Sequence, residues 1–174
     1  QKLMERLKDF IRDIPDFPKS GIVFKDISPL LEDHAALDSA IESLCLPYKG
    51  QTIDAVLGIE ARGFIFGPLV AQKLQAGFVP LRKPGKLPAE TFSVNYELEY
   101  GTSQLHMHKN ALASQARVLI IDDVIATGGT AQAGINLVEQ ANASVVGLAF
   151  LIEISFLKGR DALNGYNVHT VINF

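Results

Sequence analysis

The sequence predicts a doubly wound α/β fold, in which a mostly parallel sheet carries helices on both faces. Short apolar runs such as Val118–Ile121 are typical of strands that are buried on both faces. These runs alternate along the chain with segments of helical periodicity, which is the pattern of βαβ units. The region 82–105 differs: a basic stretch with prolines and a glycine leads into a segment where apolar and polar residues alternate from Phe92 to Tyr100. This pattern predicts an antiparallel hairpin inserted into the parallel chain.

Length and composition are those of one globular domain. The chain has 174 residues, of which 48% are hydrophobic and 20% charged, which is enough to bury a core. The net charge of −3 argues against nucleic acid as the main partner, because binding a phosphodiester backbone requires clustered basic surface. The single cysteine, Cys45, excludes an intrachain disulfide. Since no apolar run is long enough to span a bilayer, we expect a cytoplasmic protein with no membrane partner.

The first part of the chain predicts a helix over 3–14, an irregular segment over 16–31 and a second helix over 34–46. Both predicted helices have apolar residues at spacings of three and four, and prolines at positions 15 and 18 end the first. The irregular segment is predicted from its prolines and from its charged centre, Phe24-Lys25-Asp26.

The remaining sequence supplies the βαβ pattern. Continuous apolar runs predict strands over 53–59, 78–81, 118–121, 145–152 and 168–172. Helical periodicity predicts helices over 63–74, 130–140 and 155–163. In the hairpin, apolar residues alternate strictly from Phe92 to Tyr100 and again at Leu105 and Met107, and Gly101-Thr102 predicts the turn between them.

The most informative segment is Val118–Ala131, in which a predicted buried strand leads into Asp122 and Asp123. Ligands of open α/β sheets bind at the carboxyl ends of strands. Because an ionised carboxylate is costly to bury alone, the pair requires donors, water or a ligand. We expect the chain to turn here, so that both carboxylates reach one crevice. They suit a sugar diol or a metal, and the alternative is that they only cap the turn.

A turn of small residues follows the acid pair: Ala126-Thr127-Gly128-Gly129-Thr130. The glycines permit positive φ and close backbone approach. The helix predicted after the turn would point its unpaired N–H groups and positive dipole end at this place, which suits a phosphate. A plain strand-to-helix turn is the alternative. Taken with the acid pair, the turn indicates a phosphorylated ribose as ligand.

Cations follow two other predicted strands. The planar guanidinium of Arg62 has paired N–H donors that suit phosphate oxygens, although an ion pair with Glu60 is an equal alternative. Arg82, Lys83 and Lys86 suit an anion as well, or they form an ordinary solvated loop. The four histidines show no known metal-ligand spacing. Phe24 could stack on a flat base, but taken alone it is better explained as an apolar staple.

These motifs resemble those of the type I phosphoribosyltransferases. VLIIDDVIATGGTA is similar to the family's motif for phosphoribosyl pyrophosphate (PRPP). The blocks IPDFPKSGIVFKDISPLL, GIEARGFIFGP, RKPGKLP and YELEYG resemble the branch of the family that acts on adenine. The resemblance implies a single domain over 1–174 with the type I fold, a small N-terminal hood over 1–32 and a flexible hairpin lid over 83–105.

The resemblance implies a purine salvage reaction, in which the 5-phosphoribosyl group passes from PRPP to N9 of adenine and gives AMP and pyrophosphate. It also implies Mg²⁺, held mainly through PRPP and water, and a homodimer. A transferase for xanthine, guanine or hypoxanthine is one alternative. A non-catalytic PRPP-sensing regulator is another, although the sequence shows neither the DNA-binding element nor the basic surface that such a regulator requires.

The matched motifs imply a role for each group of residues. The ribose hydroxyls would bind Asp122 and Asp123, and the 5′-phosphate would bind Ala126, Thr127, Gly128, Gly129 and Thr130. Pyrophosphate would bind Ala61, Arg62, Arg82, Lys83 and Lys86, beside a cis peptide bond at Glu60–Ala61. Adenine would bind Val23, Phe24, Lys25 and Val124, with stacking on Phe24. Catalysis would involve Arg62 and the acid Glu99. The sequence departs from the family in two places. Val124 and Ile125 stand where the family often has two leucines, and Lys25 replaces an arginine of some members.

Overall fold

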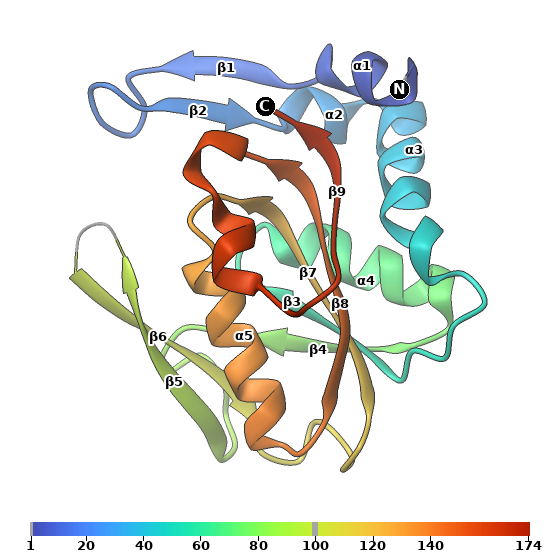
Figure 1. Cartoon of the computed structure of the whole chain (residues 1–174), viewed down its shortest axis with the longest axis vertical. Helices are drawn as coiled ribbons and strands as arrows, with labels where there is room; N and C mark the ends of the chain where they lie inside the picture. The colour runs from blue at the N-terminus through green and yellow to red at the C-terminus, as the bar shows by residue number, and fades with distance from the viewer. Residues whose placement is uncertain (1, 99–100) are drawn as a thin grey trace. The chain divides into compact units, whose positions relative to one another are not determined.

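The computed structural model describes residues 2–98 and 101–174, and Figure 1 shows their helices and strands. The chain divides into two compact units, Gln1–Ser43 and Leu44–Phe174. Within the described residues no helix combines the length and the apolar character that crossing a membrane would require.

The first unit contains two short helices and a hairpin before a longer helix begins. Its elements are α1 (Lys2–Lys8), β1 (Arg12–Pro15), β2 (Val23–Asp26), α2 (Ser28–Glu32) and most of α3 (His34–Cys45). The prediction of the second helix is confirmed by α3. Two other predictions are wrong, because the first helix ends at Lys8 and the segment 16–31 contains a strand and a helix.

Pairing between distant residues explains both errors. Strands β1 and β2 pair antiparallel, with Arg12 opposite Asp26. Across this ladder Arg12 Nη2 lies 2.6 Å from Asp26 Oδ2, and Lys25 Nζ lies 2.7 Å from Asp13 Oδ1. Hydrogen bonds from the hydroxyl and backbone N–H of Ser28, together with Arg12, lower the pKa of Asp26 to about 2. The strand partner therefore overrides the local helical periodicity of residues 3–14.

The second unit is built on a parallel sheet of five strands. Their order is β4 (Gly77–Leu81), β3 (Ala55–Ile59), β7 (Arg117–Ile125), β8 (Ser144–Glu153) and β9 (Val168–Asn173). Helices α4 (Gly63–Leu74) and α5 (Gly129–Gln140) lie on opposite faces of this sheet (Figure 1). The predicted doubly wound α/β fold is confirmed.

The strand order fixes where a ligand can bind. In order along the chain, the parallel strands occupy sheet positions 2-1-3-4-5, so the winding reverses between β3 and β7. At such a reversal the two connecting segments leave the sheet in opposite directions, and ligands bind in the crevice between them. A ligand site is therefore expected between the segments that follow β3 and β7.

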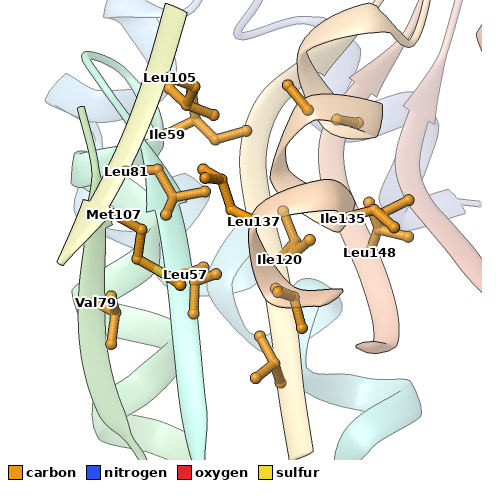
Figure 2. Close-up of a cluster of buried hydrophobic side chains, with 14 of the residues drawn as sticks. Leu57, Ile59, Val79, Leu81, Leu105, Met107, Ile120, Ile135, Leu137 and Leu148 are labelled. Carbon is orange, nitrogen blue, oxygen red and sulfur yellow. The ribbon is translucent and has the colours of Figure 1, made fainter. Parts of the chain in front are cut away.

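The inserted hairpin is confirmed, and its base belongs to the core. Strands β5 (Thr91–Leu98) and β6 (Gly101–His108) pair antiparallel along their whole length. Leu105 and Met107 of β6 are fully buried, and they pack with Leu57 and Leu137 between the sheet and α5 (Figure 2). Gly101-Thr102 does not form the turn, because β6 begins at Gly101.

The segment after β8 also differs from its prediction. In place of one helix over 155–163 it forms two short 3₁₀ helices, η2 (Ser155–Leu157) and η3 (Gly159–Leu163). Lys158 separates them with a φ of 54°, a left-handed conformation that interrupts a continuous helix. A third 3₁₀ helix, η1 (Leu46–Tyr48), follows α3.

Replacing Leu57 by alanine should lower the free energy of unfolding by about 2–5 kcal/mol, because truncating a fully buried leucine leaves a cavity. The Leu46→Ala variant is the matched control, since Leu46 is 66% exposed. It should change stability by about 0.5 kcal/mol or less. Urea denaturation of the two variants measures the difference, and equal losses would contradict the core described above.

Candidate functional site

A pocket opens at the carboxyl end of β7, beside the reversal of the sheet. It encloses about 310 Å³ of empty space, part of it open to solvent. Its lining residues are Asp122, Val124, Ile125, Ala126, Thr127, Gly128, Gly129, Thr130, Ala131 and Phe150. The whole small-residue turn predicted to bind phosphate is therefore in this pocket, together with one of the two aspartates.

The turn over 126–130 leads directly into α5, and its backbone is shaped by Gly128. This residue is the N-cap of α5 and has a φ of 88°, a conformation that favours glycine. A Cβ atom at Gly128 would lie 2.6 Å from the carbonyl oxygen of Gly159, so no larger residue fits. Within the described residues, no side chain caps the start of α5. Its first N–H groups and its positive dipole end are thus available to an anion.

The two aspartates lie within β7, which continues to Ile125. The expectation that the chain turns immediately after the acid pair is therefore wrong. Asp122 lines the pocket, whereas the side chain of Asp123 contacts Arg62. The carboxylates are also linked through the backbone, since the N–H of Asp123 donates to Asp122 Oδ1 at 2.9 Å.

Asp122 is costly to ionise in this position. Burial and the neighbouring Asp123 carboxylate raise its pKa well above the usual value of 3.8. The backbone N–H of Asp123 and the Arg62 guanidinium oppose this shift, but they are weaker. The start of α4 packs closely here, since a Cβ atom at Gly63 would lie 3.1 Å from Asp122 Oδ1. A ligand that brings positive charge or hydrogen-bond donors would relieve the carboxyl group.

Asp123 is nearly buried, with 7% of its side chain exposed, and its Oδ2 atom lies 2.7 Å from Arg62 Nε. Within the described chain, no donor is aligned to give this oxygen a hydrogen bond. The contact with Arg62 is therefore an ion pair with poor hydrogen-bond geometry. A buried oxygen of this kind is a place for a further donor or cation. Among the residues that the structure describes, no three His, Cys, Asp or Glu side chains gather into a metal site.

The segment after β3 is joined to the segment after β4 by Glu60. Its Oε1 atom accepts hydrogen bonds from Arg82 Nε at 3.1 Å and from the backbone N–H of Lys83 at 2.8 Å. The guanidinium of Arg82 also lies over the ring of Phe64, 5.6 Å from its centroid. The peptide bond between Glu60 and Ala61 is cis, as the resemblance implied.

These contacts decide how the predicted cations are arranged. Arg62 lies against Asp123, and Glu60 engages Arg82 and Lys83. The structure thus brings the loops after β3, β4 and β7 together at one end of the sheet. Lys86 is exposed in the same loop as Lys83, and its backbone N–H donates to the Lys83 carbonyl at 3.4 Å.

The hairpin contacts α5 at both ends of the helix. The carbonyl oxygen of Glu97 lies 3.5 Å from the position that a Cβ atom would occupy at Gly129, and the side chain of Gln140 donates to the Ser93 carbonyl at 3.1 Å. Glu99, the predicted catalytic acid, lies outside the described residues.

The predicted adenine-binding residues are divided between the two units. Val124 lines the pocket of the second unit. In the first unit, Val23, Phe24 and Lys25 form most of β2. The ring of Phe24 makes an edge-to-face contact with Phe17, with centroids 5.2 Å apart. The side chain of Lys25 pairs with Asp13, so its backbone remains the part that could contact a base.

Sequence reasoning missed several residues that shape the pocket. Phe150 lines it but stands in the middle of an apolar run, where no pattern distinguishes it from the core. Gly159 lies against the turn from a distant segment, and a single glycine gives no signal of such a contact. Glu60 was considered only as a partner for Arg62, yet it organises the loop after β4.

The chain resembles known proteins over almost its whole length. The phosphoribosyl transferase domain family matches residues 30–170. The adenine phosphoribosyltransferase of Methylococcus capsulatus is 54% identical over 171 residues, which cover 98% of this chain and 100% of that protein. The adenine phosphoribosyltransferase of Roseiflexus sp. is 55% identical over 168 residues, or 97% of this chain and 98% of that protein.

Solved structures agree with these sequence matches. Adenine phosphoribosyltransferase from Rhodothermus marinus superposes with a TM-score of 0.95 at 53% identity, covering 99% of both chains. The enzyme from Saccharomyces cerevisiae, solved with an imino-altritol bisphosphate and adenine, gives 0.92 at 41% identity over 98% of both chains. The chain described here therefore belongs to the phosphoribosyltransferase family, among the adenine phosphoribosyltransferases.

Proposed function

We propose that the chain transfers the 5-phosphoribosyl group of PRPP to N9 of adenine, which gives AMP and pyrophosphate in purine salvage. The observation that supports this most directly is the pocket at the end of β7. There a half-buried carboxyl group and the uncapped start of α5 face the same space. A phosphorylated sugar needs both groups, whereas a simple anion site would have no use for the carboxylate.

In this proposal the turn and the acid pair hold the two ends of ribose 5-phosphate. Backbone N–H groups and hydroxyls of residues 126–130 bind the 5′-phosphate, and each hydrogen bond to a charged group contributes about 1.5–3 kcal/mol. Asp122 and Asp123 accept hydrogen bonds from the ribose hydroxyls. Binding would thereby supply the donors that the unaligned oxygen of Asp123 lacks.

Pyrophosphate would bind where the loops after β3 and β4 meet. The proposed ligands are the backbone of Ala61, the Arg62 side chain and the cations Arg82, Lys83 and Lys86. Glu60 supports this role, because its hydrogen bonds hold Arg82 and Lys83 beside the loop that carries Arg62. Positive groups placed beside this loop would stabilise the negative charge that develops on a departing pyrophosphate.

Mg²⁺ is the proposed cofactor. The acid pair fits it, since Asp123 Oδ2 is buried and unaligned with any described donor, and Mg²⁺ prefers oxygen ligands, many of them phosphate and water. When bound, Mg²⁺ would neutralise charge on pyrophosphate. Asp122 and Asp123 would orient the ribose, and Mg²⁺ itself would be held mainly through PRPP and water.

The reaction needs little covalent help from the protein. N9 of adenine attacks the anomeric carbon as the bond to pyrophosphate breaks, so positive charge develops on the ribose ring. Catalysis then depends on positioning the two reactants and on stabilising the leaving group. We propose that the outer part of the hairpin within 83–105 acts as a lid that excludes water, and that Glu99 assists proton movement at adenine.

Adenine would stack on Phe24 and pack against Val124, while backbone groups of Val23 and Lys25 contact its edge. Two related structures support a purine nucleotide site. The Saccharomyces cerevisiae enzyme was solved with adenine, and the Trypanosoma brucei enzyme, 26% identical with a TM-score of 0.91, was solved with AMP, pyrophosphate and ribose-5-phosphate. We further propose that the chain acts as a homodimer in the cytoplasm, which sedimentation and cell fractionation would test.

Two competing functions have the same PRPP site. A transferase for another purine would differ only in the groups that contact the base, and a PRPP sensor would bind without turnover. Incubation with PRPP and Mg²⁺ and with adenine, hypoxanthine, guanine or xanthine in turn distinguishes them. AMP formation from adenine supports the proposal; turnover of only a 6-oxo purine, or of no base, refutes it.

Replacing Asp122 by asparagine should raise stability while lowering activity. A raised pKa in the folded state means that stability is greatest below the usual carboxyl pKa of 3.8 and falls as pH rises through the raised pKa. Asparagine does not titrate, so the variant should unfold at higher urea concentration than the wild type at pH 7. Its kcat/KM for PRPP should fall at least about tenfold, because a hydrogen bond to a charged group is lost.

Urea denaturation between pH 5 and pH 8, with kinetics at the same pH values, checks the Asp122 prediction. Asp54→Asn is the control, because Asp54 accepts a backbone hydrogen bond from Arg117 at the opposite end of β7. That variant should lose stability and keep its affinity for PRPP. Unchanged PRPP kinetics in Asp122→Asn would show that the Asp122 carboxyl group does not bind the ribose.

Replacing Phe24 by alanine should raise the KM for adenine by about fivefold to a hundredfold, because stacking a base on an aromatic ring contributes about 1–3 kcal/mol. The KM for PRPP should change much less. Phe24→Tyr keeps the ring and should remain close to the wild type. Steady-state kinetics with each substrate varied in turn measure the two KM values, and equal changes in both would count against stacking on Phe24.

A further inference from the structure

The phosphate-binding turn rests on a segment that lies outside the pocket lining. A Cβ atom at Gly159, the first residue of η3, would collide with the carbonyl oxygen of Ala126 and would lie 2.8 Å from Ile125 Cγ1. In the reverse direction, a Cβ atom at Gly128 would meet the Gly159 carbonyl at 2.6 Å and Ala162 at 2.9 Å. The two backbones are therefore in contact with no room for a methyl group, and the position of η3 limits the position of the turn.

The side chain of Arg160 ties η3 to the edge of the sheet. Its Nε atom donates to both carboxylate oxygens of Glu153, at 3.1 and 2.9 Å. Its Nη1 atom donates to the Val168 carbonyl at 2.9 Å, and its Nη2 atom to Thr170 Oγ1 at 3.1 Å. These bonds use the rigid fork of a guanidinium, so they fix the orientation of the residue next to Gly159.

Glu153 connects this arrangement to β7. It is 8% exposed and is the last residue of β8, where it lies opposite Ile125 in the ladder. The N–H of Ile154 donates to the Ile125 carbonyl at 3.1 Å. Because a carboxylate this buried requires a partner, Arg160 is held where it is. The pair thus joins the end of β7, the phosphate-binding turn and η3 into one rigid unit.

We propose that Glu153 and Arg160 are positioning residues for the ribose phosphate site. Neither lines the pocket. They act through Gly159, which keeps the backbone of Ala126 and Gly128 in place. This inference rests on the proposed function, since it assumes that the turn binds the 5′-phosphate of PRPP. A phosphate site made of backbone N–H groups depends on their placement to within about half an ångström.

The inference predicts an effect confined to one substrate. In Arg160→Met, the KM for PRPP should rise about tenfold, which corresponds to about 1.4 kcal/mol. The KM for adenine should change less than about twofold, a difference of roughly 0.4 kcal/mol. Calorimetric titration with ribose 5-phosphate should show the same loss of affinity. Arg160→Lys keeps the charge but loses the fork, and it should lie between Arg160→Met and the wild type.

Arg117→Met is the matched control for general loss of stability. Arg117 also anchors its segment through Nε, which donates to the Thr52 carbonyl at 2.8 Å, but it begins β7 at the end of the strand remote from the pocket. This control should lower Tm and leave both KM values unchanged. A Tm loss in Arg160→Met with unchanged affinity for ribose 5-phosphate, or an equal rise in both KM values, would overturn the inference.

A second pair of variants covers the case in which Arg160→Met fails to fold. Gly159→Ala pushes directly on the Ala126 carbonyl and should raise the KM for PRPP selectively. Gly165→Ala is its control, because Gly165 has a φ of 92° with no neighbour within 4 Å of an added Cβ, so the change strains only its own backbone. Equal PRPP affinity in these two variants would overturn the inference.

The wild-type protein separates this inference from the proposed function. A wild type that neither binds ribose 5-phosphate nor forms AMP refutes the function itself. A wild type that does both, with Arg160→Met indistinguishable from it in PRPP affinity, refutes only the positioning role.

Discussion

The repulsion between two adjacent carboxyl groups at the end of a buried strand is the constraint to which the rest of the site responds. Burial and the Asp123 charge both raise the pKa of Asp122. Arg62 reaches across the reversal of the sheet to Asp123, and the ion pair ties the loop after β3 to β7. Arg62 does not offset all of the repulsion between the two carboxyl groups. A ligand that brings hydrogen-bond donors or a cation would remove the rest. The acid pair is thus better explained by ligand binding than by the stability of the fold.

Close contact between backbone segments is the second feature of this end of the sheet. Gly63 lies against Asp122, and Gly128 and Gly159 lie against each other. An added methyl group at any of these positions would meet a neighbour at 3.1 Å or less. Side chains at these positions would push the contacting segments apart and so displace the backbone that is proposed to bind a sugar phosphate. The site is therefore defined as much by where side chains are missing as by the charges around it.

Much of this could be predicted from the sequence, because a parallel sheet gives a strong local signal. The apolar run before Asp122, the small-residue turn and the following helix were sufficient to predict the strand, the helix and a crevice between them, although not that β7 continues to Ile125. Contacts between distant segments were not predictable. The β1–β2 hairpin depends on partners 14 residues apart, such as Arg12 and Asp26. The contact of Gly159 with the turn likewise depends on how two loops pack, and the periodicity of a sequence does not predict such packing.

The transferred group and the acceptor base of the proposed reaction are inferred from different kinds of evidence. Every residue proposed for ribose 5-phosphate lies within nine consecutive positions, 122–130, so a single motif indicates what is transferred. The acceptor is proposed to contact backbone groups of β2 and the ring of Phe24, which taken alone is better explained by packing. Backbone groups are the same in every residue, so the sequence motif cannot express a preference for one base. Similarity over the whole chain to adenine phosphoribosyltransferases supplies that part of the argument, and base-by-base kinetics are the direct measure of it.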